Sequence, residues 1–151
     1  MNVIFLDIDG VLNTNGDINL IENTFELNKL KLLIKLSEET NSKIVIISDR
    51  RTLESEREMI GRVFYNHGVN IDYLSLKRTH RKRSDEILYY LDNNDVNKHV
   101  ILDDNDLGYS KNNELRRHFI NTYDNGFTNK EYEQAKVILW RKNLWKSQKL
   151  K

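Results

Sequence analysis

Hydrophobic positions along this chain follow two alternating patterns. Short runs rich in β-branched and aromatic residues predict buried strands. Longer segments with apolar residues at helical spacing lie between these runs and predict amphipathic helices. The predicted strands cover residues 3–6, 44–47, 69–76, 99–102 and 119–123, and the predicted helices cover residues 25–36, 52–67, 84–91 and 128–144.

This alternation predicts an α/β fold, with a parallel sheet between helices in a three-layer, Rossmann-like arrangement. Parallel strands need crossover connections, and the predicted helices supply them. Because 151 residues is about the length of one domain, we expect residues 1–151 to form a single domain. Ligands of such sheets bind at the carboxyl ends of the strands. The residues that directly follow the strands are therefore the first candidates for function.

Acidic residues stand at the ends of two predicted strands. Asp7 and Asp9 follow the first strand, and Asp103 and Asp104 follow the fourth. Asp7 and Asp9 would share a face of an ideal strand, so at least three carboxylates would meet at one rim. Such a cluster repels itself unless a cation neutralises it, and oxygen ligands without His or Cys favour a hard ion, most simply Mg²⁺. The pattern therefore predicts a magnesium site.

A cation at this rim would make it suitable for phosphate chemistry. One carboxylate can attack phosphorus and form an aspartyl-phosphate. A second carboxylate, two residues further on, can protonate the leaving oxygen and later activate water. Ser48, at the end of the second predicted strand, can donate a hydrogen bond to the transferring phosphoryl group. A cationic side chain near the fourth strand would balance the charge on the phosphoryl oxygens.

Three segments resemble motifs of the haloacid dehalogenase (HAD) superfamily of phosphatases. Residues 3–12, with the sequence VIFLDIDGVL, are similar to its first motif. Residues 44–48 are similar to its second motif, a hydrophobic strand that ends in Ser or Thr. Residues 101–104 resemble the acidic pair of its fourth motif. The resemblance extends over residues 3–139, and it implies the HAD variant of the α/β fold.

A narrower resemblance concerns nucleic-acid repair. The DGVLN segment at residues 9–13, the acidic fourth strand and residues 125–128 are similar to the small HAD domain of RNA repair proteins. Residues 48–50, Ser-Asp-Arg, are similar to the Ser-Gly-Arg of polynucleotide 3′-phosphatases. This resemblance implies that the substrate is a phosphorylated nucleic-acid end.

The superfamily resemblance implies roles for individual residues. Asp7 would be the nucleophile, and Asp9 the general acid and base. Mg²⁺ would be held by Asp7, by the backbone carbonyl of Asp9, and by Asp103 or Asp104. Ser48 would hold the phosphate.

The cationic third motif has two candidates, Lys82 and Arg83. The family places a Lys, or sometimes an Arg, just before a helix. Spacing to Ile87 favours Arg83, whereas residue type favours Lys82, and the sequence leaves both open. We further expect the substrate to contact other residues along the rim, namely Gly10, Asp49, Arg50, Arg51 and Arg81.

Simpler interpretations exist for several of these residues. The segment 7–10 could open a calcium-binding loop, but Val11 and Ile18 stand where that loop needs ligands. Ser48 could be only the cap of a helix or turn. Residues 104–106 could be only a polar loop.

Composition excludes several classes of protein. With 24 Lys and Arg against 23 Asp and Glu, the net charge of +1 does not by itself indicate a nucleic-acid or membrane partner. The absence of cysteine excludes disulfides, Cys-ligated zinc and thiol catalysis. The apolar runs are far shorter than the roughly 20 residues of a membrane span, and no signal-peptide pattern follows Met1. We therefore expect a cytoplasmic protein without a membrane partner or an obligate protein partner.

Basic residues are concentrated in two places. Residues 77–83, KRTHRKR, are either a solvated loop or a phosphate-attracting lip beside the rim along which a nucleic-acid backbone could lie. Residues 144–151 are interpreted as a frayed basic tail.

No insertion in the predicted fold is long enough for a separate lid. Residues 10–19 permit only a short flap, so we expect a capless HAD domain, whose open rim suits macromolecular ends or other large phosphates. We expect a Mg²⁺-dependent phosphomonoester hydrolase that acts on RNA or DNA ends or on nucleotides, that is, a polynucleotide phosphatase or nucleotidase. Two alternatives remain: a small-molecule metabolite phosphatase, and a HAD-like binding or regulatory module without turnover, suggested by the irregular third motif.

Overall fold

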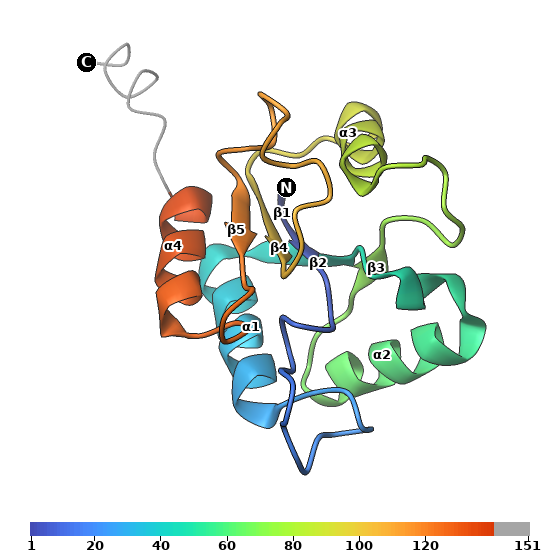
Figure 1. Ribbon diagram of the computed structural model, residues 1–151, viewed down its shortest axis with the longest axis vertical. Helices are drawn as coiled ribbons and strands as arrows, with labels where there is room; N and C mark the ends of the chain where they lie inside the picture. Colours follow the sequence, from blue (N-terminus) through green and yellow to red (C-terminus); the bar gives the residue numbers. More distant parts are fainter. Residues whose placement is uncertain (141–151) are drawn as a thin grey trace.

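A five-stranded parallel sheet forms the centre of the molecule in this computed structural model, which describes residues 1–140 (Figure 1). The strand order is β3-β2-β1-β4-β5, and each neighbouring pair runs parallel. The predicted α/β, Rossmann-like architecture is thereby confirmed. The strands are β1 (Asn2–Leu6), β2 (Ser42–Ile46), β3 (Asp72–Tyr73), β4 (His99–Asp103) and β5 (Phe119–Asn121).

Helices cover both faces of the sheet, because side chains of the central strand alternate between two hydrophobic cores. On β1, Ile4 and Leu6 belong to one core, and Val3 and Phe5 belong to the other. Helices α1, α2 and α4 close the first core, while α3 and the segment 107–115 close the second. The helices are α1 (Leu27–Thr40), the short 3₁₀ helix η1 (Asp49–Thr52), α2 (Glu54–Asn66), α3 (Arg83–Asn93) and α4 (Asn129–Trp140).

The third strand is the largest departure from the sequence-based prediction. Of the predicted segment 69–76, only Asp72–Tyr73 pairs with β2. This strand lies at the edge of the sheet. The apolar residues Val69 and Ile71 pack against the first core from an irregular backbone. Their hydrophobicity therefore reflects burial rather than strand pairing.

Other predicted boundaries move by a few residues at the ends of elements. The second strand was expected at 44–47 and extends from Ser42 to Ile46. The predicted end of the last helix at residue 144 lies outside the described residues, and so does the predicted basic tail 144–151.

The fold brings the carboxyl ends of β1, β2 and β4 to one rim, since β1 pairs with both of its neighbours in parallel. The connection from β1 to α1 consists of turns and one isolated bridge, between Ile21 and Phe25. This connection has the form expected of a short flap. In the part of the chain that the structure describes, no helix is long and apolar enough to cross a membrane.

Candidate active site

Three acidic side chains converge at the rim. Asp7 follows β1 directly, Asp103 is the last residue of β4, and Asp104 is the next residue. The ladder continues past the end of β1, where the Asp7 amide donates to the Leu102 carbonyl at 2.9 Å. Carboxylate oxygens of Asp7, Asp103 and Asp104 all lie within 4.8 Å of one another. Asp103 is fully buried and Asp7 nearly so.

Among residues 1–140, a single guanidinium contacts this cluster. Arg83, the first residue of α3, places Nη1 3.2 Å from Asp103 Oδ2 and 3.8 Å from Asp7 Oδ1. Its Nη2 lies 3.3 Å from Asp49 Oδ1. Lys82 does not line the cleft at the acidic rim; its side chain lies in a neighbouring cavity. Of the two candidates for the cationic third motif, the structure brings Arg83 to the acidic residues.

The negative charge of the cluster exceeds what one arginine balances. Burial, together with the charge of Asp103, raises the pKa of Asp7 to about 9, although Arg83 acts in the opposite direction. Burial and the same neighbour raise the pKa of Asp104. A divalent cation would remove this repulsion, and a donor set made only of oxygens fits Mg²⁺. The residues present therefore fit a hard metal ion.

Gly10 makes room for Asp104. Its backbone has a φ of +80°, a conformation that other residues rarely adopt. A Cβ atom there would come within 2.1 Å of Asp104 Oδ2. The Gly10 carbonyl accepts a hydrogen bond from the Thr122 hydroxyl at 2.8 Å, which ties the segment to the residues after β5. Gly10 therefore supports the position of an acidic side chain, a role different from the expected contact with substrate.

Asp9 lines the same cleft but is not part of the carboxylate cluster, and it binds Arg50. Arg50 Nε and Nη2 each donate to one Asp9 oxygen at 2.8 Å, and Asn13 donates to the same carboxylate at 3.1 Å. The hydrogen bonds from Arg50 are the main reason that the pKa of Asp9 is lowered. Arg50 also pairs with Glu56 at 3.1 Å. The side chain of Asp9 remains more than half exposed.

Ser48 lies two residues after the end of β2, at the rim, and is almost fully buried. Its Oγ accepts a hydrogen bond from the Arg50 amide at 3.2 Å, so it caps the 3₁₀ helix η1. This bond uses an acceptor position, which leaves the hydroxyl proton for a ligand. Ser48 lines a cleft of about 390 Å³ that also contains Asp7, Asp9, Asp49, Arg50, Arg83, Asp103 and Asp104.

Arg51 does not reach this cleft, and the expectation that it contacts substrate is wrong. Its side chain is fully buried, and its Nη2 lies 2.7 Å from Glu86 Oε2 on α3. Its Nη1 donates to the Ile47 carbonyl at 2.6 Å. The 3₁₀ helix after β2 turns Arg51 inward, whereas the neighbouring Arg50 faces the rim. Arg51 therefore connects β2 to α3 inside the protein.

Tyr109 belongs to the site although nothing in the sequence singled it out. It lies in the loop after β4 and is fully buried. Its hydroxyl donates to Asp103 Oδ2 at 2.9 Å, beside the bond from Arg83. Asp103 Oδ1 accepts from the Asn105 amide at 3.0 Å. These bonds fix the orientation of the buried carboxylate. One tyrosine in a polar loop carries no sequence signal for this role.

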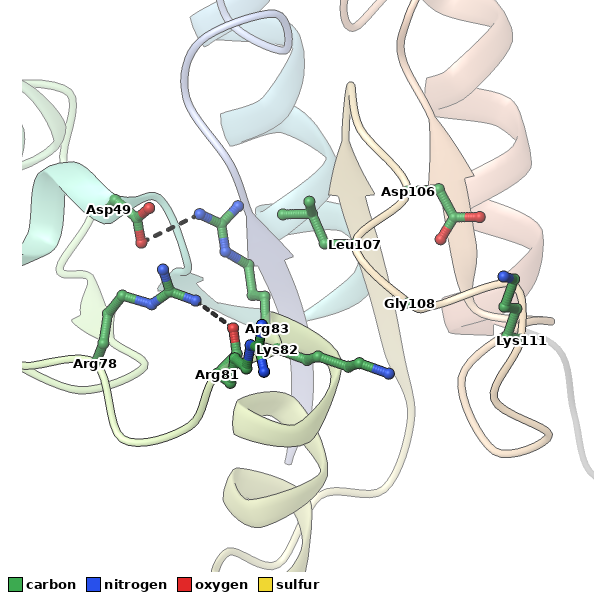
Figure 2. A pocket seen from close by; sticks show the side chains of 9 residues that line it. All are labelled: Asp49, Arg78, Arg81, Lys82, Arg83, Asp106, Leu107, Gly108 and Lys111. Atoms are coloured by element: carbon green, nitrogen blue, oxygen red, sulfur yellow. Dashed lines mark hydrogen bonds and ion pairs between the residues drawn. The ribbon is translucent and has the colours of Figure 1, made fainter.

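Arg81, expected at the substrate site, lines a second cavity beside the acidic cleft. Figure 2 shows this cavity, with Arg78, Arg81 and Lys82 on one side and Lys111 on the other. Asp49 and Arg83 belong to the walls of both cavities. The predicted site residues thus divide between two adjoining hollows, apart from Gly10 and the buried Arg51, which line neither.

Comparison with known families agrees with this geometry. A profile of the family described as "HAD domain in Swiss Army Knife RNA repair proteins" matches residues 3–132, which include the acidic ends of β1 and β4. Searches of curated proteins and of solved structures found no match. Since the matched segment covers most of the chain and all the clustered carboxylates, the chain belongs to the HAD domain family of Swiss Army Knife RNA repair proteins.

Proposed function

We propose that this protein is a Mg²⁺-dependent phosphomonoester hydrolase that transfers a phosphoryl group to Asp7, with nucleic-acid ends or nucleotides as substrates. The convergence of Asp7, Asp103 and Asp104 beside Arg83 is the observation that carries the proposal. Membership in the HAD domain family supports it, because enzymes of this kind are typically phosphohydrolases.

The side chains of Asp7, Asp103 and Asp104, with the backbone carbonyl of Asp9, would hold the metal. Bound Mg²⁺ would neutralise the carboxylates and the phosphate charge. The orientation of Asp103 does not depend on the metal alone, because Tyr109, Arg83 and the Asn105 amide already hold it.

In the first half of the proposed reaction, an oxygen of Asp7 attacks phosphorus. The new bond to Asp7 forms as the bond from phosphorus to the leaving oxygen breaks, and Asp9 donates its proton to that oxygen. Ser48 and Arg83 line the same cleft and would donate hydrogen bonds to the phosphoryl oxygens. In the second half, Asp9 takes a proton from water, whose oxygen attacks phosphorus and releases inorganic phosphate from Asp7.

The ion pair between Asp9 and Arg50 bears on this proton transfer. A carboxylate that accepts two hydrogen bonds from a guanidinium is ionised and has no proton to give. Asp9 would therefore have to leave Arg50 and take up a proton from solvent before it protonates the leaving group. A substrate phosphate is an alternative partner for Arg50, because both residues line the same cleft.

Two observations support a nucleic-acid end over a small metabolite. The family is defined in RNA repair proteins, and exposed basic side chains surround the cavity beside the cleft. RNA and DNA ends both present the terminal phosphomonoester that this chemistry requires.

The test is phosphate release from an aryl phosphate and from a 3′-phosphorylated oligonucleotide, each with Mg²⁺ and with EDTA. We expect release only with Mg²⁺, and a loss of at least about 10⁴-fold in Asp7→Asn, as for other nucleophile substitutions. Asp124→Asn, at an exposed position outside the cleft, is the matched control and keeps the activity. If the wild type releases no phosphate from any phosphoester, the protein is a binding module and the proposal is wrong.

A further inference from the structure

The cavity beside the catalytic cleft has the properties of an anion-binding site. It has a volume of about 420 Å³ and lies between the start of α3 and the segment 106–111. Four cationic residues outside the catalytic cleft line it: Arg78, Arg81, Lys82 and Lys111 (Figure 2).

Within the part of the chain that the structure describes, most of this positive charge has no partner. Among residues 1–140, the side chains of Arg81, Lys82 and Lys111 form neither an ion pair nor a hydrogen bond. The two acidic residues in the wall are already bound: Asp49 pairs with Arg83 at 3.3 Å, and Asp106 accepts hydrogen bonds from Ser110. The cavity is therefore open to a negatively charged ligand.

The loop that carries these cations is anchored. The backbone amide of Thr79 donates to the buried Glu86 Oε2 at 3.1 Å. Arg78 Nη2 donates to the Arg81 carbonyl at 2.6 Å, and its Nε lies 4.0 Å from Glu86 Oε1. These contacts tie the backbone of residues 78–81 to α3 beside the cleft.

The cavity also adjoins the reaction centre directly. Asp49, Arg83 and Leu107 line both hollows, and the ion pair between Asp49 and Arg83 forms part of the shared wall. Because the two hollows share a wall, one substrate molecule with a phosphate beside Asp7 can extend into the cavity of the cations.

We propose that this cavity is a second phosphate subsite, which binds a non-reacting phosphate of the same substrate and selects substrates that carry two or more phosphates. The inference rests on the proposed hydrolase function, since the first phosphate is the one that reacts. The second phosphate has two chemical sources, the phosphodiester next to a nucleic-acid end and the other phosphate of a nucleoside bisphosphate.

The first experiment compares kcat/KM for three substrates with the same reacting group. These are a nucleoside 3′-monophosphate, a nucleoside 3′,5′-bisphosphate and a 3′-phosphorylated dinucleotide. We expect the dinucleotide to exceed the monophosphate by about tenfold or more, because charge-assisted contacts are worth that much. An equal increase for the bisphosphate assigns the subsite to any second phosphate, and an increase for the dinucleotide alone assigns it to a nucleic-acid strand. Equal values for all three substrates overturn the inference.

The matched variants are Lys82→Ala/Lys111→Ala, in the cavity, and Lys31→Ala/Lys130→Ala, on α1 and α4. All four lysines are exposed and unpaired among the described residues, so both variants lose the same charge. The cavity variant should bring the ratio of dinucleotide to monophosphate kcat/KM close to one, and the control should keep the wild-type ratio. Equal ratios in the two variants contradict the inference.

A binding measurement separates this inference from the hydrolase proposal. The affinity of a fluorescent 3′-phosphorylated oligonucleotide is measured in the Asp7→Asn background, without turnover, over a range of salt concentrations. The cavity variant should bind more weakly than the control and lower the slope of log K against log salt by about 0.7 per lost phosphate contact. Identical slopes and affinities rule out the subsite, whatever the wild type does to an aryl phosphate. Weaker binding without any hydrolysis by the wild type would support the subsite and reject the hydrolase.

Discussion

Two clusters of buried charged side chains lie next to each other and differ in charge balance. In the first, Arg51 and Glu86 form a pair that is almost completely shielded from solvent. In the second, Asp7, Asp103 and Asp104 share one arginine, Arg83. Asp49 connects the two clusters, because its Oδ1 lies 3.6 Å from Arg51 and 3.3 Å from Arg83.

This difference in charge balance distinguishes buried charges that stabilise the fold from buried charges that bind a ligand. A single pair, whose charges balance each other, needs no ion from outside. The acidic cluster has more negative charge than its arginine compensates, and burial, together with the charge of Asp103, raises the pKa of Asp7. An excess of this kind is tolerated where a cation or substrate completes the site. The comparison therefore makes opposite predictions for substitutions in the two clusters.

The largest effect is expected from breaking the balanced pair. Arg51→Met leaves the Glu86 carboxylate buried without its main partner, and we expect the free energy of unfolding to fall by about 3–5 kcal/mol. Arg62→Met is the control, because the pair of Arg62 with Glu22 is exposed and is worth less than about 1 kcal/mol. Urea unfolding measures both variants. A loss in Arg51→Met no larger than the loss in the control would mean that the pair is not structural.

The inward position of Arg51 shows where sequence reasoning stops. Strand ends could be located because apolar runs end at Asp7, Ser48 and Asp103, and parallel pairing brings such ends together. The direction of side chains after the strand depends on the 3₁₀ helix η1, which sends Arg50 to the rim and Arg51 to the interior. Two adjacent arginines carry no pattern that separates these outcomes.

Addition of Mg²⁺ is expected to have the next largest effect, through the unbalanced cluster. At a concentration 100 times the dissociation constant, a ligand that binds only the folded state stabilises it by about 2.7 kcal/mol. Thermal unfolding with Mg²⁺ and with EDTA measures this difference. It should shrink in Asp104→Asn and remain in Asp124→Asn, which lies outside the cluster. An equal gain in both variants would show that Mg²⁺ binds elsewhere.

Removal of one carboxylate should stabilise the metal-free protein. The pKa of Asp7 is raised in the fold, to about 9 from 3.8, so its contribution to stability is lost as pH rises from about 3.8 towards 9. At pH 7 the full shift corresponds to roughly 4 kcal/mol. We expect Asp7→Asn to regain about half of this free energy of unfolding in EDTA, because its neutral amide is still a buried polar group. The same variant should be inactive. If Asp7→Asn is less stable than the wild type in EDTA, the expectation that this carboxylate destabilises the metal-free protein is wrong.

Two further features of the site could not be predicted because they depend on how a loop and a helix start are placed in the fold. Asp103 and Asp104 could be located from their strand, but Tyr109 meets Asp103 only because the loop after β4 folds back beneath it. The choice between Lys82 and Arg83 likewise depended on where α3 begins. With Arg83 as its first residue, the helix directs Arg83 to the acidic cluster and leaves Lys82 in the neighbouring cavity.

His99 is a buried ionisable group that forms no ion pair among residues 1–140, and it tests how burial alone changes the pH dependence of stability. Burial, and the charge of His118 stacked on it with ring centroids 3.9 Å apart, lower the pKa of His99 to about 3. The folded protein therefore keeps this ring neutral, while the unfolded chain binds a proton below about pH 6.5. Stability present above pH 6.5 is consequently lost as pH falls towards 3, by roughly 1 kcal/mol between about pH 7 and 5.5. His99→Phe, which keeps a ring beside Phe5 and His118, should remove that part of the decline in urea unfolding at the two pH values. If the decline is unchanged in His99→Phe, His99 binds its proton equally well in the folded and unfolded states. The prediction that the folded protein keeps this ring neutral would then be wrong.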